Sequence, residues 1–188
     1  MPSTESVLIH IDGAARGNPG PAACGVIVKS VQGKILEEVA RPLGRATNNL
    51  AEYQALLAAL ECSLERGYQR VKMYSDSQLL TRQINGEYKV RNADLLPLYR
   101  RAREMIARLD SFSITHVPRE KNRDADRLAN QALDSAADSS SARKKKKQEE
   151  TLRLTAVYRN GALHPVDAIS LDEGEIVELE LFRKRSKP

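Results

Sequence analysis

Four acidic residues stand at positions where a folded sheet could bring their side chains together. Asp12 follows the apolar run "VLIHI", and Asp76 follows "RVKMYS". Glu52 lies near the start of "NNLAEYQALLAALECSLERG", and Asp126 lies in "RDADRLANQAL". Clustered carboxylates repel one another unless cations balance them, and their hard oxygen atoms select Mg²⁺ or Mn²⁺. Two such ions about 3.5–4 Å apart can activate a water and stabilise the leaving oxygen of a phosphodiester.

Each acid taken alone has a simpler explanation. Asn49 and Glu52 have the spacing of a helix capping box, and Ser75 with Gln78 resembles another cap. Asp126 near a helix start would be favoured by the helix dipole. These local explanations must together account for four acids at element ends that can all face one edge of a sheet. We therefore favour a metal cluster.

The hydrophobic pattern predicts the elements that would position these acids. Strands are expected at residues 7–11, 24–30, 34–43, 70–75 and 112–117, and helices at 48–67, 77–84, 93–109 and 123–133. Gln32 and Gly33 mark a hairpin, and Gly67 marks a helix end. Three strands followed by alternating helices and strands predict an α/β fold, with a mixed sheet covered by helices.

Composition divides the chain into three parts. The segment "DSAADSSSARKKKKQEE" is too polar to build a core. We predict a body at residues 1–137, a flexible basic linker at 138–150 and a small β-rich domain at 151–188.

The overall charge permits a nucleic acid partner. The 188 residues carry a net charge of +5, with a sequence pI near 9.3. Cys24 and Cys62 lie in apolar stretches, as reduced core cysteines of an intracellular protein do. Neither a signal peptide nor a long apolar run is present, which predicts a cytoplasmic protein with no membrane partner.

The stretches "IDGAARGNPG", "TNNLAEYQAL", "YSDSQLL" and "VPREKNRDADRLANQAL" together resemble the ribonuclease H family, type 1, in its compact prokaryotic and archaeal-like members. The resemblance covers about residues 5–137 and includes the four acids in order. It implies a ribonuclease H-like mixed five-stranded sheet and an endonuclease that cuts the RNA strand of RNA–DNA hybrids, leaving 5′-phosphate and 3′-hydroxyl ends. It also implies two Mg²⁺ ions, with Mn²⁺ as a substitute, held by Asp12, Glu52, Asp76 and Asp126.

The resemblance further implies a set of contacts with the hybrid. The glycine-rich loop would bring its backbone close to the minor groove, and Thr47 would help to hold a phosphate of the DNA strand near a helix N-terminus. Turn and cap chemistry explains the same residue types and would coexist with binding. The residues implied to bind substrate are Gly13, Arg16, Gly17, Asn18, Thr47, Asn48, Asn49, Gln78 and Asn122.

The sequence departs from the family pattern in two places. Many members carry a histidine in the loop before the last helix, whereas "VPREKNRDAD" has none and His116 lies in the preceding strand. Arg119 is our candidate for the catalytic residue that takes the place of this histidine, with Glu120 as the alternative. The lysine-rich insertion of longer members is also missing, and only Lys89 and Arg91 remain as a basic patch.

The C-terminal segment "AVYRNGALHPVDAISLDEGE" resembles a small β-rich, antitoxin-like family. Strands are expected at 155–159, 162–166 and 175–182, as a small all-β unit. Residues 151–182 carry two arginines and six acids, so this unit should repel nucleic acid. We expect it to form a homodimer or bind a protein, while residues 143–147 add salt-dependent affinity for the substrate. A solvated linker with a passive appendage is the alternative.

Two other functions compete with a hybrid-specific nuclease. One is a non-catalytic module that binds hybrids or double-stranded RNA; loss of any of the four acids would have favoured it, and none is lost. The other is an enzyme that also accepts double-stranded RNA. A fragment of a reverse transcriptase is disfavoured because the chain contains no polymerase motifs.

Overall fold

The computed structural model describes residues 6–149 and 156–166, although side chains between 138 and 149 are not described. The chain divides into two compact units, Met1–Lys144 and Lys145–Pro188.

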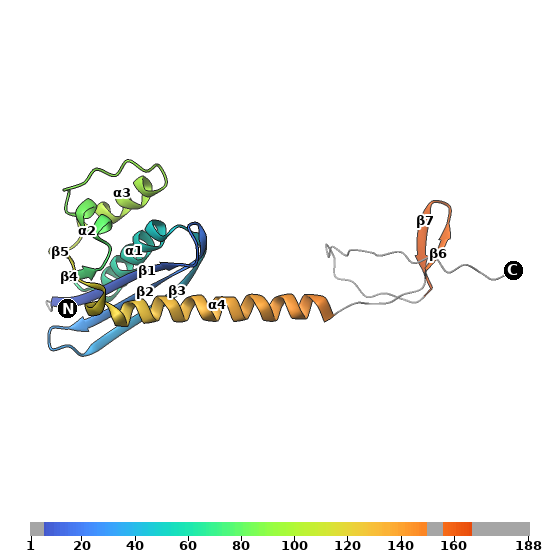
Figure 1. Cartoon of the computed structure of the whole chain (residues 1–188), viewed down its shortest axis with the longest axis horizontal. Helices are drawn as coiled ribbons and strands as arrows, with labels where there is room; N and C mark the ends of the chain where they lie inside the picture. The colour runs from blue at the N-terminus through green and yellow to red at the C-terminus, as the bar shows by residue number, and fades with distance from the viewer. Residues whose placement is uncertain (1–5, 150–155, 167–188) are drawn as a thin grey trace. The chain divides into compact units, whose positions relative to one another are not determined.

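A five-stranded mixed sheet forms the centre of the first unit (Figure 1). Its strands are β1 (Ser6–Ala15), β2 (Gly20–Ser30), β3 (Ile35–Ala46), β4 (Arg70–Ser75) and β5 (Ser111–His116), in the order β3-β2-β1-β4-β5. Strands β1, β2 and β3 pair antiparallel, whereas β4 is parallel to both β1 and β5. The helices are α1 (Asn48–Arg66), α2 (Gln78–Ile84), α3 (Leu95–Ile106) and α4 (Arg123–Glu149), and a short 3-10 turn, Arg119–Lys121, precedes α4. The predicted mixed five-stranded sheet with flanking helices is confirmed.

Helices α1 and α4 cover opposite faces of this sheet. A Cβ atom built on Gly13 would lie 2.2 Å from the carbonyl carbon of Ala51 in α1, and one on Gly25 would lie 2.7 Å from the backbone nitrogen of Ala129 in α4. Only glycine allows the two helices to approach this closely. Asp12 pairs with Gly25 across the antiparallel strands, and such partners point to the same face. Asp12 therefore faces the α4 side of the sheet.

The main core lies between the sheet and α1. Leu56, Leu57 and Leu60 of α1 are buried against alternate residues of β1, as the helical spacing of the leucines predicts. The helix ends at Gly67, whose left-handed φ of 75° suits glycine and confirms the predicted stop. The core thereby fixes the position of the first turns of α1, where Glu52 lies.

The structure corrects the predicted end of the first strand. Strand β1 does not end at Asp12 but continues to Ala15, which pairs with Ala22 of β2. The extension is possible because Gly13 has no side chain and leaves room for the α1 backbone. Strand β1 can therefore continue beneath the helix. The tight loop spans residues 16–19 only, and Asp12 lies inside a regular strand.

The structure also corrects the predicted linker. Helix α4 runs from Arg123 to Glu149, so residues 138–149 of the expected flexible linker are helical. Alanine, arginine, lysine, glutamine and glutamate favour helices, and the segment contains neither glycine nor proline to end one. The polar composition of residues 138–149 rules out a hydrophobic core in this segment, but it is compatible with a helix.

Beyond the end of α4, the described part of the second unit is a β-hairpin. Strands β6 (Ala156–Arg159) and β7 (Ala162–Pro165) pair antiparallel. They are joined by Asn160 and Gly161, with φ values of 52° and 85°, as the predicted Asn-Gly turn requires. The third strand expected, at residues 175–182, lies outside the described residues.

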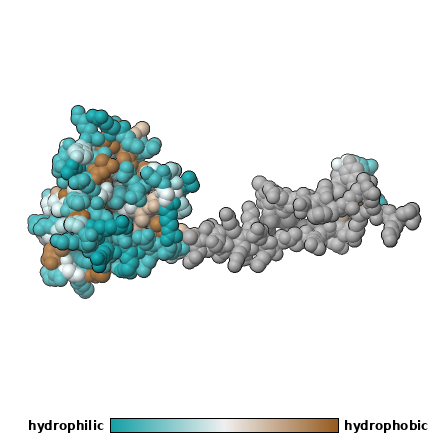
Figure 2. Space-filling model, viewed as in Figure 1, coloured by the Kyte–Doolittle hydropathy of each residue, from teal (hydrophilic) through white to brown (hydrophobic). Residues whose placement is uncertain are grey.

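The surface of the first unit is mostly hydrophilic in the view of Figure 2, with small hydrophobic areas. Within residues 6–149 and 156–166, no helix is long and apolar enough to cross a membrane. Cys24 is buried, Cys62 is partly buried, and both are free thiols.

Candidate active site

Three of the four predicted acids converge at one place. Asp12, Glu52 and Asp76 each offer a carboxylate oxygen, and these oxygens lie within 4.8 Å of one another. Ile11 and Ser75 are partners in the parallel pair of β1 and β4, so the residues that follow them lie at the same level of the sheet. Glu52 reaches this level from α1. Three elements distant in sequence thus supply the acids.

The capping explanation for Glu52 is wrong. The N-cap of α1 is Thr47, whose hydroxyl oxygen accepts a hydrogen bond from the backbone N–H of Leu50 at 3.3 Å. Glu52 lies beyond the first turn of the helix, where a capping side chain cannot act. Its carboxylate is buried, only 7% exposed, and faces the other acids.

One oxygen of Glu52 indicates that the cluster is built for a cation. The backbone N–H of Gly13 donates to the Glu52 carboxylate, but the buried Oε2 atom has no hydrogen-bond partner within the described part of the chain. A buried, unpaired carboxylate oxygen is costly. Burial, followed by the charges of Asp12 and Asp76, raises the pKa of Glu52 well above its usual range. A divalent cation among these oxygens would remove both penalties.

Burial and nearby charges also disfavour the ionised form of Asp12. Burial raises its pKa from 3.8 to about 7, and the charges of Asp76 and Asp126 contribute in the same direction. Burial and the neighbouring charges therefore favour the protonated forms of Asp12 and Glu52 when no metal is bound. All three residues offer the hard oxygen ligands that Mg²⁺ and Mn²⁺ prefer.

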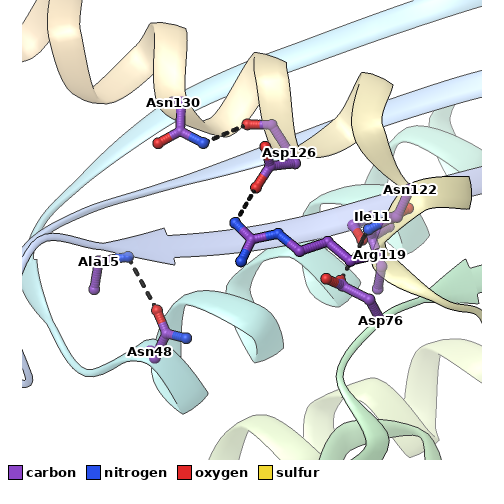
Figure 3. A network of polar contacts seen from close by, with 8 residues as sticks. All are labelled: Ile11, Ala15, Asn48, Asp76, Arg119, Asn122, Asp126 and Asn130. Carbon is purple, nitrogen blue, oxygen red and sulfur yellow. Dashed lines mark hydrogen bonds and ion pairs between the residues drawn. The ribbon is translucent and has the colours of Figure 1, made fainter.

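The fourth acid, Asp126, is held by an arginine. Its Oδ1 atom lies 2.7 Å from Nη2 of Arg119, and its backbone carbonyl accepts from Asn130 at 2.9 Å (Figure 3). Asp126 is close enough to raise the pKa of Asp12, and Arg119 is close enough to lower it. Arg119 thus lies near the acids and carries the opposite charge, and its catalytic role stays a prediction.

Asn122, which we predicted to bind substrate, lies in a buried position, with only 1% of the residue exposed. Its amide nitrogen donates to the carbonyl of Ile11 at 2.8 Å and to Oδ1 of Asp76 at 3.0 Å. Asn122 lies behind the acids and holds one of them.

Sequence reasoning missed His10. Its Nδ1 atom lies 3.3 Å from Oδ1 of Asn122, and its ring stacks on Tyr74 with centroids 5.0 Å apart. Burial lowers the pKa of His10. Strand alternation could have revealed it, because a residue two before Asp12 shares its face of the sheet.

The glycine-rich loop is tied to the start of α1, beside the acids. The backbone N–H of Asn48 donates to Oδ1 of Asn18 at 3.1 Å, and the backbone N–H of Ala15 donates to Oδ1 of Asn48 at 3.1 Å. Gly17 has a φ of 106°, and a Cβ on Gly20 would lie 2.0 Å from the carbonyl oxygen of Arg16. The loop is therefore tight, and its polar groups are held by backbone contacts.

The other residues predicted to bind substrate surround this loop or lie near it. Arg16 forms an ion pair with Asp134 of α4, and Gly13 is buried under α1. Asn49 and Gln78 are exposed. Their contacts with a substrate stay predictions.

A sheet in this strand order, with acids converging from β1, α1 and the end of β4, defines a ribonuclease H-like nuclease fold. Residues 10–132 match the profile of a family described as reverse transcriptase-like, and residues 154–187 match one described as AF2212-like. The ribonuclease H of Methylococcus capsulatus is 32% identical over 154 residues, which cover 74% of this chain and 97% of that protein. The chain belongs to the ribonuclease H family, type 1.

Two further relatives support this assignment. Ribonuclease HI of Halobacterium salinarum is 49% identical over 127 residues, 68% of this chain. The matched residues span 64% of that relative's length. The crystal structure of ribonuclease H1 from the same organism has a TM-score of 0.68 at 48% identity, covering 69% of this chain and 98% of the solved one. LC11-RNase H1, solved in complex with an RNA/DNA hybrid, has a TM-score of 0.67 at 39% identity, covering 70% of this chain and 99% of that one.

Proposed function

We propose that the first unit is a metal-dependent endonuclease that cuts the RNA strand of RNA–DNA hybrids. The observation that carries the proposal is the convergence of Asp12, Glu52 and Asp76, with the buried Oε2 atom of Glu52 left without a partner. A relative solved with an RNA/DNA hybrid supports the choice of substrate.

We propose Mg²⁺ as the metal, in two sites, with Mn²⁺ as a substitute. Asp12, Glu52 and Asp76 would hold the ions, and Asp126 would join them once Arg119 releases it. When bound, such ions polarise the phosphodiester and supply an activated water at neutral pH. The products would be 5′-phosphate and 3′-hydroxyl ends.

The chain's own residues would orient the substrate. The loop of residues 16–19 and the start of α1 lie beside the acids and are linked through Asn18 and Asn48. Exposed polar groups there would contact the 2′-hydroxyl groups that an A-form minor groove displays. Asn49, Gln78, Arg16 and Thr47 would add contacts to the hybrid's backbone.

Cleavage of end-labelled RNA tests this function directly. The RNA would be supplied single-stranded, in a hybrid and in an RNA duplex, with Mg²⁺ and with EDTA. We expect cutting of the hybrid that EDTA abolishes and that Asp12→Asn reduces to background. Asp110→Asn, which alters an exposed aspartate outside the cluster, is the matched control and should cut as well as the wild type.

Each alternative would give a different pattern. Hybrid binding without cutting would contradict the enzyme and leave a recognition module. Cutting of the RNA duplex would widen the substrate to double-stranded RNA. Cutting that continues in EDTA would contradict the metal dependence.

We further propose that the C-terminal domain forms a homodimer or binds a protein, and that the protein acts in the cytoplasm. Only a hairpin of this domain lies within the described residues, and residues 154–187 match a profile described as AF2212-like. The net negative charge of residues 151–182 argues against a direct contact with nucleic acid.

A further inference from the structure

We propose that His10 is a positioning residue, which acts through Asn122 to hold Asp76 in place as a metal ligand. This inference rests on the proposed function, because it assigns a role at the same site. It is carried by a continuous set of contacts from His10 to the cluster.

The partners of Asn122 determine how its amide is oriented. Its nitrogen faces the carbonyl oxygen of Ile11 at 2.8 Å and a carboxylate oxygen of Asp76 at 3.0 Å. Both partners are acceptors, so the NH₂ group must point to them; the reverse orientation would oppose oxygen to oxygen. The remaining amide oxygen then needs a donor.

His10 is placed to supply that donor. Its Nδ1 atom lies 3.3 Å from the amide oxygen of Asn122, and Asn122 itself is buried. The His10 ring is held by stacking on Tyr74, its partner in the parallel pairing of β1 and β4. With a proton on Nδ1, His10 satisfies the last polar atom of the Asn122 side chain.

Asp76 needs this support more than its neighbours do. Asp12 and Glu52 are buried, whereas Asp76 is only partly buried and follows the last residue of β4. The Asp76 carboxylate accepts a hydrogen bond at 3.0 Å from the buried amide of Asn122, which lies outside the group of acids. Hydrogen bonds from outside a metal site orient its ligands, and their loss weakens metal binding. Freeing Asn122 should therefore let Asp76 leave the ligand position.

The test is metal binding to the full chain carrying His10→Phe. Phenylalanine keeps a ring beside Tyr74 but removes the Nδ1 donor. Isothermal titration with Mn²⁺ should show affinity weakened about threefold to tenfold. Cleavage of the hybrid at a fixed, sub-saturating Mn²⁺ concentration should show a lower kcat with an unchanged KM. His116→Phe, in an exposed position on β5, is the matched control and should change neither quantity.

Two further measurements keep the test decisive. His10→Gln retains a donor group and should recover part of the lost affinity, which a purely structural role would not explain. In the wild-type protein without metal, ¹⁵N shifts of the His10 ring should show a proton on Nδ1. Wild-type affinity in His10→Phe, or a proton on Nε2 alone, would overturn the proposal. If the wild type itself bound no Mn²⁺ and cut no hybrid, the proposed function would fail, which is a separate outcome.

Discussion

The guanidinium of Arg119 lies 2.7 Å from the carboxylate of Asp126, the acid that stands outside the group of three. Arg119 lies in the 3-10 turn before α4, and Asp126 lies in the first turn of α4. The Arg119 side chain is largely exposed, whereas that of Asp126 is about one quarter exposed. Burial and the neighbouring acids raise the pKa of Asp12 and of Glu52, and the arginine charge offsets part of this rise. Arg119 therefore serves as counter-charge to the cluster, and a second metal ion would have to replace it at Asp126.

Arg119→Ala should separate turnover from metal binding. We expect kcat for hybrid cleavage to fall about tenfold or more, because a group beside the reacting centre is lost. Metal affinity should not weaken, since Asp126 loses a competitor. Rate measurements and Mn²⁺ titration check the two effects. Arg123→Ala, an exposed arginine four residues away, is the control; an unchanged rate in Arg119→Ala would remove Arg119 from catalysis.

Stability without metal should depend on pH through Asp12. Its pKa is raised from 3.8 to about 7, so the folded state binds the proton more tightly than the unfolded state does. The stability that the proton on Asp12 contributes is fully present below about pH 4, and it is lost as the pH rises through about 7. In EDTA, Asp12→Asn should exceed the wild type in free energy of unfolding at pH 8, by on the order of 2–4 kcal/mol. This advantage should shrink at pH 5.

Denaturant unfolding at the two pH values measures the effect, with Asp110→Asn as control. Mg²⁺ should stabilise the wild type more at pH 8 than at pH 5, since the ion requires ionised carboxylates. An equal advantage of Asp12→Asn at both pH values would contradict the shifted pKa.

Gly13→Ala should damage both stability and activity. The added Cβ would lie 2.2 Å from the backbone nitrogen of Glu52, so the start of α1 must move away from β1. We expect a loss of about 2–3 kcal/mol in the free energy of unfolding and a large drop in cleavage rate. Gly33→Ala is the control: its φ of 85° makes it strained, but its Cβ meets open space far from the acids. Activity retained in Gly13→Ala would show that α1 is not held as we describe.

The basic run at residues 143–147 should strengthen substrate binding through charge. Replacing all five residues with glutamine should raise KM for the hybrid about tenfold at low salt, and the difference should vanish at high salt. Deleting residues 151–188 instead should leave KM unchanged while reducing the oligomeric mass. If deletion of residues 139–188 changed neither KM nor mass, the tail would be a passive appendage.

Much of the secondary structure could be predicted from sequence because local interactions decide it. The leucine spacing of α1, its stop at Gly67 and the Asn160-Gly161 hairpin all depend on neighbours within a few residues. The acids indicated a metal cluster through their chemistry, because carboxylates that gather need cations to balance their charge. The extent of β1 could not be predicted, since it depends on α1 passing over Gly13.

The sequence by itself determined the residue types of the site: four acids, a glycine-rich loop, and an arginine, Arg119, in the loop before the last helix. Only the tertiary structure decided which groups meet. Asn122 bonds to Ile11 across 111 positions of sequence, and His10 reaches Asn122 across 112. No local pattern specifies such pairs, because they form only when packing of the sheet and its helices brings distant segments into contact.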